Sequence, residues 1–156
     1  SYLKTKLKDI SNLKILLAGN GPLQADLEKQ VQDYGLQNVV RFLGYRTDLE
    51  KVVPAVDMIV SCSRREGLPL NIIEALLCKK PIVASVNRGH KELIKDGENG
   101  YLFAPEDWET MAKRIFEVYQ GEEKTLSEMG EKGYQIAQKY TVAAVEEELR
   151  RIYDLR

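Results

Sequence analysis

Five short apolar segments alternate with amphipathic segments along the 156-residue chain, and this alternation constrains the fold more than any other feature. The apolar segments have the length of buried strands and end at glycine, proline or polar residues. They are Leu13–Ala18, Val39–Leu43, Val56–Cys62, Ile82–Val86 and Tyr101–Phe103. Strands that alternate with helices favour parallel pairing through right-handed crossovers. The sequence therefore predicts a Rossmann-like three-layer α/β/α sandwich with a mainly parallel sheet.

The amphipathic segments predict helices whose ends carry capping residues. Gly35 follows a helix expected over 22–34 in the place of a C-terminal cap, and Asp107 precedes a helix in the place of an N-terminal cap. Further helices are expected at 3–10, 48–53, 69–77, 89–94, 124–139 and 142–153. In the helix after Asp107, five large apolar residues recur at helical spacing and are expected to face the core. They are Trp108, Met111, Ile115, Phe116 and Tyr119.

Composition excludes several classes of protein. Lysine and arginine number 23 against 24 acidic residues, a net charge of −1, so the basic excess of a nucleic-acid binder is missing. No apolar run approaches the ~20 residues of a membrane span. Cys62 and Cys78 are too few for a disulfide framework or a four-thiolate zinc site and are expected to be small core residues. With one histidine, His90, and no Asp-x-Asp pair, no metal site is predicted. The expected protein is cytoplasmic.

Four loops are candidates for a binding site. In a parallel α/β sheet, ligands bind outside the carboxyl ends of the strands, which places 19–22, 44–48, 63–71 and 87–92 at the site. The turn Gly19-Asn20-Gly21 could form a phosphate nest, but it lacks the third glycine and the Lys-Ser/Thr of known phosphate loops, and a plain strand-to-helix turn also explains it. Arginines in or beside these loops suit phosphate contact, although each could also be a solvated charge. They are Arg46, Arg64, Arg65 and Arg88.

The loop 63–71 carries the most chemistry. Glu66 is expected at a strand end, and the backbone N–H groups of Gly67, Leu68 and Leu70 lie near a helix N-terminus, which attracts anions and oxygen-rich ligands. The alternative is that Glu66 only complements the helix dipole.

Glu74 follows about two turns further along the same helix. Its carboxylate could accept hydrogen bonds from a vicinal diol such as a ribose. The other interpretation is a solvated helix residue. Because the surrounding stretch 70–77 is apolar and a carboxylate rarely buries without a partner, we favour a functional role.

Four sequence runs together resemble the C-terminal half of a retaining GT-B glycosyltransferase, in order and in spacing. They are G-N-G-P-L at 19–23, N-V-V-R-F-L-G-Y at 38–45, S-x-x-E-G-L-P-L-x-x-x-E from Ser63 and N-R-G-H-K-E-L-I-K-D-G-E-N-G-Y-L from Asn87. The resemblance is closest to the bacterial group-1 enzymes of capsule and exopolysaccharide synthesis. Glu66 and Glu74 match the E-x7-E motif of that family.

The resemblance implies a reaction and a set of roles. GT-B enzymes have two Rossmann-like domains, and the C-terminal one binds a nucleotide-diphospho-sugar, with a UDP-sugar as our first choice. Transfer would retain the anomeric configuration without a bound metal or cofactor. By analogy, Glu66 would be catalytic at the donor sugar and Glu74 would bind the ribose. The other implied donor-binding residues are Gly19, Asn20, Gly21, Tyr45, Arg46, Arg64, Gly67, Leu68, Pro69 and Leu70.

Two departures from the family pattern change the expectations. Many relatives have E-G-F-G at 66–69, and here Pro69 removes one N–H donor. The first strand of the domain, its Arg- and Lys-bearing loop and the acceptor domain would all precede Ser1. We therefore expect 1–156 to be one nucleotide-sugar-binding domain that is inactive alone. Its vacant central strand position would be closed by direct pairing of the neighbouring strands or by another chain.

The expected partners are the nucleotide-sugar donor and a glycan or lipid-linked acceptor held by the other domain. Nucleic acid is not expected, and only the full-length enzyme would meet the inner membrane surface. Two alternatives stay open, a GT-B nucleotide-sugar epimerase and a nucleotide-binding module without catalysis. A receiver-like module is disfavoured, because the first two strands end in Ala18-Gly19 and Leu43-Gly44 and not in acidic residues.

Overall fold

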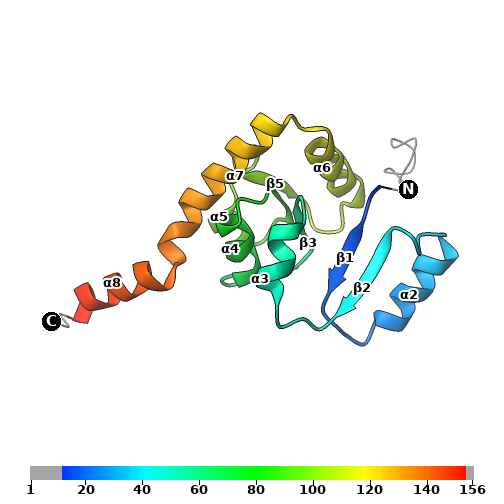
Figure 1. Ribbon diagram of the computed structural model, residues 1–156, viewed down its shortest axis with the longest axis horizontal. Coiled ribbons are helices and arrows are strands. Elements are labelled where there is room, and N and C mark those ends of the chain that lie inside the picture. The colour runs from blue at the N-terminus through cyan, green and yellow to red at the C-terminus, as the bar shows by residue number, and fades with distance from the viewer. Residues whose placement is uncertain (1–11, 154–156) are drawn as a thin grey trace. The chain divides into compact units, whose positions relative to one another are not determined.

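The computed structural model describes residues 12–153, and the helix expected at 3–10 lies outside them. The chain divides into two compact units, of which the first ends at Leu49 and the second begins at Glu50. Every strand ladder in the described residues is parallel, as predicted. The strands are β1 (Ile15–Ala18), β2 (Val40–Gly44), β3 (Ile59–Ser61), β4 (Ile82–Ser85) and β5 (Gly100–Phe103) (Figure 1).

The strands form two separate sheets. In the first unit β1 pairs with β2, and in the second the order is β3-β4-β5. The expected closure of the vacant central position, by direct pairing of the neighbouring strands or by another chain, stays a prediction. Each βαβ step within a sheet still follows the predicted alternation, which confirms the α/β class.

The first unit holds one helix, α2 (Gln24–Asp33), between its two strands. The predicted cap is confirmed, since Gly35 has φ +64° and donates to the Gln32 carbonyl at 2.9 Å. Leu36 donates to the Val31 carbonyl at 2.8 Å, which completes the hydrogen-bond pattern of a Schellman motif.

Helices cover both faces of the sheet in the second unit. The elements from Leu49 onward are α3 (Leu49–Val52), the 3₁₀ turn η1 (Val53–Ala55), α4 (Leu70–Leu77), α5 (Arg88–Leu93), α6 (Trp108–Gln120), α7 (Glu123–Ala137), the 3₁₀ turn η2 (Gln138–Tyr140) and α8 (Val142–Tyr153), of which α4 and α6 contact the sheet directly. Helix α6 packs on β4 and β5, α4 packs on β4 from the other side, and α7 packs outside α4. Figure 1 shows α8 extending away from these helices.

The face under α6 is an apolar cluster centred on Val83, Phe103 and Val118, with Met111 and Ile115 against it. The predicted inward face of α6 is therefore confirmed in its middle. It is wrong for two residues nearer the ends, since Trp108 is 59% and Tyr119 is 54% exposed. The 13 residues of α6 extend about 20 Å, whereas the four residues of β5 extend about 13 Å, so the ends of the helix reach past the strand.

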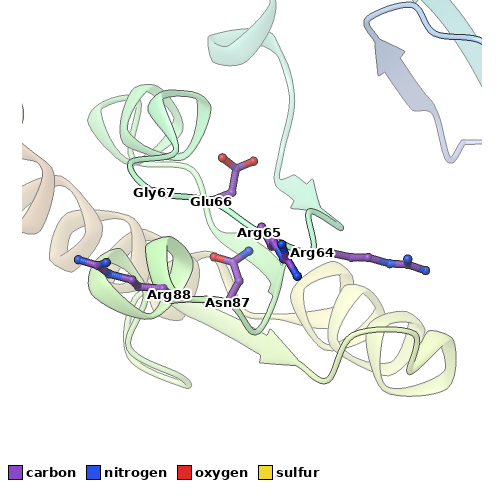
Figure 2. A pocket seen from close by; sticks show the side chains of 6 residues that line it. All are labelled: Arg64, Arg65, Glu66, Gly67, Asn87 and Arg88. Carbon is purple, nitrogen blue, oxygen red and sulfur yellow. The ribbon is translucent and has the colours of Figure 1, made fainter.

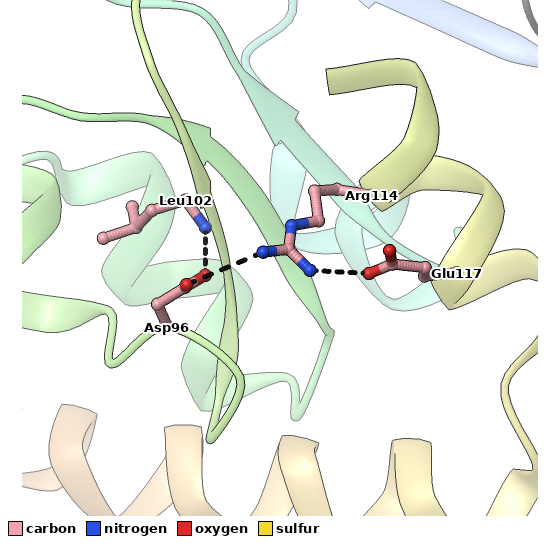
Figure 3. Close-up of polar contacts among 4 residues, drawn as sticks. All are labelled: Asp96, Leu102, Arg114 and Glu117. Atoms are coloured by element: carbon pink, nitrogen blue, oxygen red, sulfur yellow. Dashed lines mark hydrogen bonds and ion pairs between the residues drawn. The ribbon is translucent and has the colours of Figure 1, made fainter. Parts of the chain in front are cut away.

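An arginine links the turn before β5 to α6 (Figure 3). Asp96 accepts a hydrogen bond from the Leu102 backbone at 2.8 Å and lies 3.8 Å from the Arg114 guanidinium. Arg114 also donates to Glu117 at 2.8 Å and lies 4.8 Å from the centre of the Tyr101 ring. The hydrogen bond from Arg114 to Glu117 raises the pKa of Arg114 above its usual value. Asp96 thus connects the turn to β5 through Leu102 and to α6 through Arg114.

The cap of α6 predicts a measurable pH dependence. Asp107 accepts a hydrogen bond from the Thr110 backbone at 2.9 Å, and this bond lowers the pKa of Asp107. Because the pKa of this carboxyl group is lower in the folded than in the unfolded protein, the ionised group stabilises the fold above the unfolded-state pKa of about 3.9. This stabilisation is lost as the pH falls through the folded-state pKa. Asp107→Asn keeps a capping side chain without the charge. We expect wild type to melt above this variant at pH 6 and the Tm difference to shrink by pH 3; a constant difference would contradict the assignment.

Candidate functional site

An open pocket of about 500 Å³ lies at the carboxyl ends of β3 and β4 (Figure 2). The loop after β3 and the junction between β4 and α5 form its lining, at the sheet edge where the ligand loops were expected. The lining residues are Arg64, Arg65, Glu66, Gly67, Asn87 and Arg88. The pocket thus combines one carboxylate, backbone amides, one carboxamide and three guanidinium groups.

Gly89 joins the two halves of the pocket wall. Its backbone N–H donates to the Glu66 carbonyl at 3.1 Å. A Cβ atom at this position would lie 2.7 Å from the Gly67 carbonyl oxygen and 2.9 Å from both the Glu66 oxygen and a carbon of Pro69. Only glycine lets the first turn of α5 approach the loop this closely. The sequence indicated Gly89 only as the start of a helix.

Buried polar side chains hold together the two segments that line the pocket. Asn87 caps α5 by accepting from the His90 backbone at 2.9 Å, and its side-chain amide donates to the Ser63 carbonyl at 2.8 Å. The Ser85 hydroxyl donates to the same carbonyl at 2.7 Å. Since Ser85 and Asn87 are at most 9% exposed, these bonds form largely away from water. They fix the loop after β3 to the end of β4.

His90 is fully buried in this network. Its Nδ1 lies 2.6 Å from the Ser85 carbonyl oxygen and 2.9 Å from the Asn87 amide nitrogen. The nearer carbonyl can only accept, and the Asn87 amide already donates to Ser63, so we assign the ring proton to Nδ1. Nε2 lies 3.3 Å from the Ser61 hydroxyl and accepts from it. The sequence indicated His90 only as a single histidine that cannot build a metal site. The signal that could have found it is the capping asparagine three residues earlier.

The start of α4 has the expected amides at its exposed edge. Pro69 is buried and is the N-cap residue, whereas Leu68 is 51% and Leu70 is 63% exposed. Glu74 is exposed and does not line the pocket. The stretch around it is largely buried, as expected, through Ile72, Ile73, Ala75 and Leu76, whereas the Glu74 side chain lies on the exposed side of α4.

The candidate arginines differ in their partners. Arg46 donates to Asp48 through two nitrogens, at 2.8 and 2.7 Å. Arg64 pairs with Glu106 at 2.5 Å, although both side chains are largely exposed.

Glu106 has an unusual backbone. It has φ +69° and follows Pro105 in a turn in which Asp107 donates to the Ala104 carbonyl at 3.0 Å. This pattern is typical of a type II turn, whose third position favours glycine. A left-handed non-glycine residue costs roughly 1–2 kcal/mol, more than the roughly 0–1 kcal/mol of an exposed ion pair such as the one with Arg64. The pair therefore does not offset the strain.

The expected residues of the first unit gather at one edge of its own sheet. Gly19 has φ +125° and donates to the Gly44 carbonyl at 2.7 Å, so the turn after β1 lies against the end of β2. Asn20 and Gly21 continue that turn. Tyr45, directly after β2, is 74% exposed.

The two cysteines do not lie where the sequence predicted them. Cys62 is exposed, with its sulfur 3.6 Å from that of Met111, and Cys78 is partly buried, so neither belongs to the fully buried core that we expected. In the part of the chain that the structure describes, no helix is long and apolar enough to cross a membrane. Within 12–153, no three His, Cys, Asp or Glu side chains gather as a metal site would require.

Comparison with known proteins identifies relatives that match most of the chain. Residues 2–136 match the family model described as "Glycosyl transferases group 1". EpsD of Bacillus subtilis (strain 168) is 33% identical over 144 residues, which are 92% of this chain and 38% of EpsD. The poly(ribitol-phosphate) alpha-N-acetylglucosaminyltransferase of Staphylococcus aureus (strain COL) is 28% identical over 150 residues, 95% of this chain and 30% of that protein. The chain thus spans well under half of these relatives.

Solved structures of relatives have the same fold. Anabaena HepE in complex with UDP superposes with a TM-score of 0.81 at 29% identity, over 91% of this chain and 41% of HepE. A point mutant of S. aureus TarM, in complex with fondaparinux, alpha-GlcNAc-glycerol and UDP, gives a TM-score of 0.79 at 28% identity, over 90% of this chain and 29% of TarM. The Rossmann-like GT-B fold is confirmed, and the chain belongs to the group 1 family of glycosyl transferases.

Proposed function

We propose that this chain is the donor-binding domain of a glycosyltransferase of glycan biosynthesis and that its donor is a UDP-sugar. The observation that carries the proposal is the pocket, in which the Glu66 carboxylate lies beside the amide-rich Gly67 loop and arginines at the carboxyl end of the sheet. Sugar hydroxyls need both acceptors and donors, and a diphosphate needs cations and N–H groups, so this combination suits a nucleotide-diphospho-sugar. The UDP bound to HepE supports the choice of nucleotide.

Each group has a place in the proposed reaction. Glu66 would face the donor sugar, where its charge stabilises the developing positive charge at the anomeric carbon. The N–H groups at the start of α4 and the basic side chains would stabilise the departing diphosphate. We propose retention of configuration without a metal ion, with the acceptor, a glycan or lipid-linked sugar, held by a second domain of the enzyme in the cytoplasm.

A calorimetric panel of UDP, GDP, ADP and their sugars with the full-length enzyme tests the function directly. We expect UDP and one UDP-sugar to bind with higher affinity than the GDP and ADP series. Failure of every nucleotide to bind would exclude a donor-binding role.

Glu74→Ala tests the proposed contact with the ribose. Loss of a hydrogen bond to a charged group costs roughly 1.5–3 kcal/mol, so UDP affinity is expected to fall about 10- to 100-fold. Glu147→Ala, which removes an exposed glutamate from α8, is the matched control. Equal UDP affinities of the Glu74 variant and wild type would remove this role while leaving the donor function intact.

A further inference from the structure

The three arginines of the pocket are not equivalent. Arg64 is paired with Glu106, and Arg88 donates to Glu92 at 3.2 Å. Figure 2 shows these two side chains extending outward to opposite sides of the pocket. Arg65 has neither an ion pair nor a side-chain hydrogen bond within residues 12–153. One lining arginine is therefore available to a ligand without the loss of an existing contact.

The difference in partners determines how each arginine would meet a phosphate. An unpaired guanidinium presents five N–H donors in a planar fork that fits phosphate oxygens. At Arg64 or Arg88 the incoming phosphate would lie beside a carboxylate, and the two negative charges would repel each other. Arg65 is paired with no carboxylate in residues 12–153, so a phosphate would meet its guanidinium without displacing an existing partner.

Glu106, the partner of Arg64, has a strained backbone conformation, so the local backbone does not explain why a glutamate occupies this position. Glycine would fit the third position of this turn without strain, yet the chain places there the carboxylate that binds Arg64. Strain in a residue that contacts a pocket side chain points to a role in the site. Here that role is to hold Arg64 away from the ligand.

We propose that Arg65 is the pocket arginine that contacts the phosphate groups of the nucleotide donor, while Glu106 and Glu92 keep Arg64 and Arg88 from it. This inference rests on the proposed donor-binding function and deepens it. It moves the basic contact of this loop from Arg64, which the family resemblance indicated, to the neighbouring residue.

The test compares UDP with uridine, which lacks the diphosphate, in Arg65→Gln of the full-length enzyme. We expect UDP affinity to fall about 10- to 100-fold, as for a lost hydrogen bond between charged groups, and uridine affinity to stay within twofold. The salt dependence of UDP binding is expected to become shallower, because one cation that meets the phosphates is gone. Titration calorimetry gives the UDP values and ligand-detected NMR gives those of uridine.

Two matched arginine variants separate a phosphate contact from a general charge effect. Arg88→Gln removes a paired arginine from the same pocket, and we expect it to weaken UDP binding at least fivefold less than Arg65→Gln. Arg151→Gln removes a charge from α8 and controls for net charge.

Three results would overturn the inference. In the first, Arg65→Gln and Arg88→Gln weaken UDP binding equally. In the second, the Arg65 variant weakens UDP and uridine binding in parallel. In the third, the wild-type enzyme fails to bind UDP at all, and only this result would also overturn the proposed function.

Discussion

Gly89→Ala is expected to weaken UDP binding by more than tenfold and to lower the free energy of unfolding by about 1–3 kcal/mol, the usual cost of overpacking. The new methyl group would overlap two backbone carbonyls, those of Glu66 and Gly67. Backbone atoms cannot rotate aside as a flexible side chain can, so either α5 or the loop must move. Because that loop forms the pocket wall, movement of the loop displaces Glu66. Calorimetry with UDP and urea denaturation measure the two effects.

Two other glycines serve as controls for this substitution. A Cβ at Gly67 meets no atom within 4 Å, so Gly67→Ala is expected to leave the stability of the unliganded protein unchanged. A Cβ at Gly121 meets the side chain of Leu126 and, at 3.2 Å, the Val118 carbonyl oxygen, between α6 and α7. Gly121→Ala should therefore leave UDP affinity unchanged. Wild-type stability and affinity in Gly89→Ala would show that α5 and the loop are not in the close contact described here.

Local sequence signals were sufficient to predict the helices and strands, and they also predicted the edge of the sheet at which the pocket lies. Apolar runs predicted all five described strands to within three residues at each end, because a buried parallel strand has apolar side chains on both faces. Gly35 and Asp107 predicted helix ends because each cap depends on one residue and its immediate neighbours. Parallel pairing then determined where the strand ends, and hence Glu66 and Gly67, would lie.

The partners within the pocket could not be predicted, since they depend on contacts between residues distant in sequence. Arg64 and Glu106 are 42 positions apart, so no local pattern indicates that one is paired and Arg65 is not. Gly89 indicates no more than an ordinary helix start until the loop after β3 is packed against it. The exposure of Glu74 could not be predicted either, because an apolar helix can still leave one narrow side exposed.

Glu66→Gln is expected to lower kcat for sugar transfer about 100-fold or more while UDP affinity changes less than threefold. The substitution keeps the shape of the side chain and removes its charge. In the proposed reaction that charge acts on the sugar as positive charge develops, and preorganised electrostatic groups of this kind are typically worth about 10²–10³ in kcat. UDP lacks the sugar, so its binding does not use the carboxylate.

The measurement is the rate of UDP release from the UDP-sugar that binds best, with the full-length enzyme. Glu109→Gln makes the same chemical change at an exposed position in the first turn of α6 and should keep the wild-type rate. A wild-type kcat in Glu66→Gln would remove Glu66 from catalysis. Parallel losses of kcat and UDP affinity would instead assign Glu66 to the nucleotide. Figure 2 shows the Glu66 carboxylate projecting from the loop on the side away from Arg88 and Asn87, which leaves it open to a bound sugar.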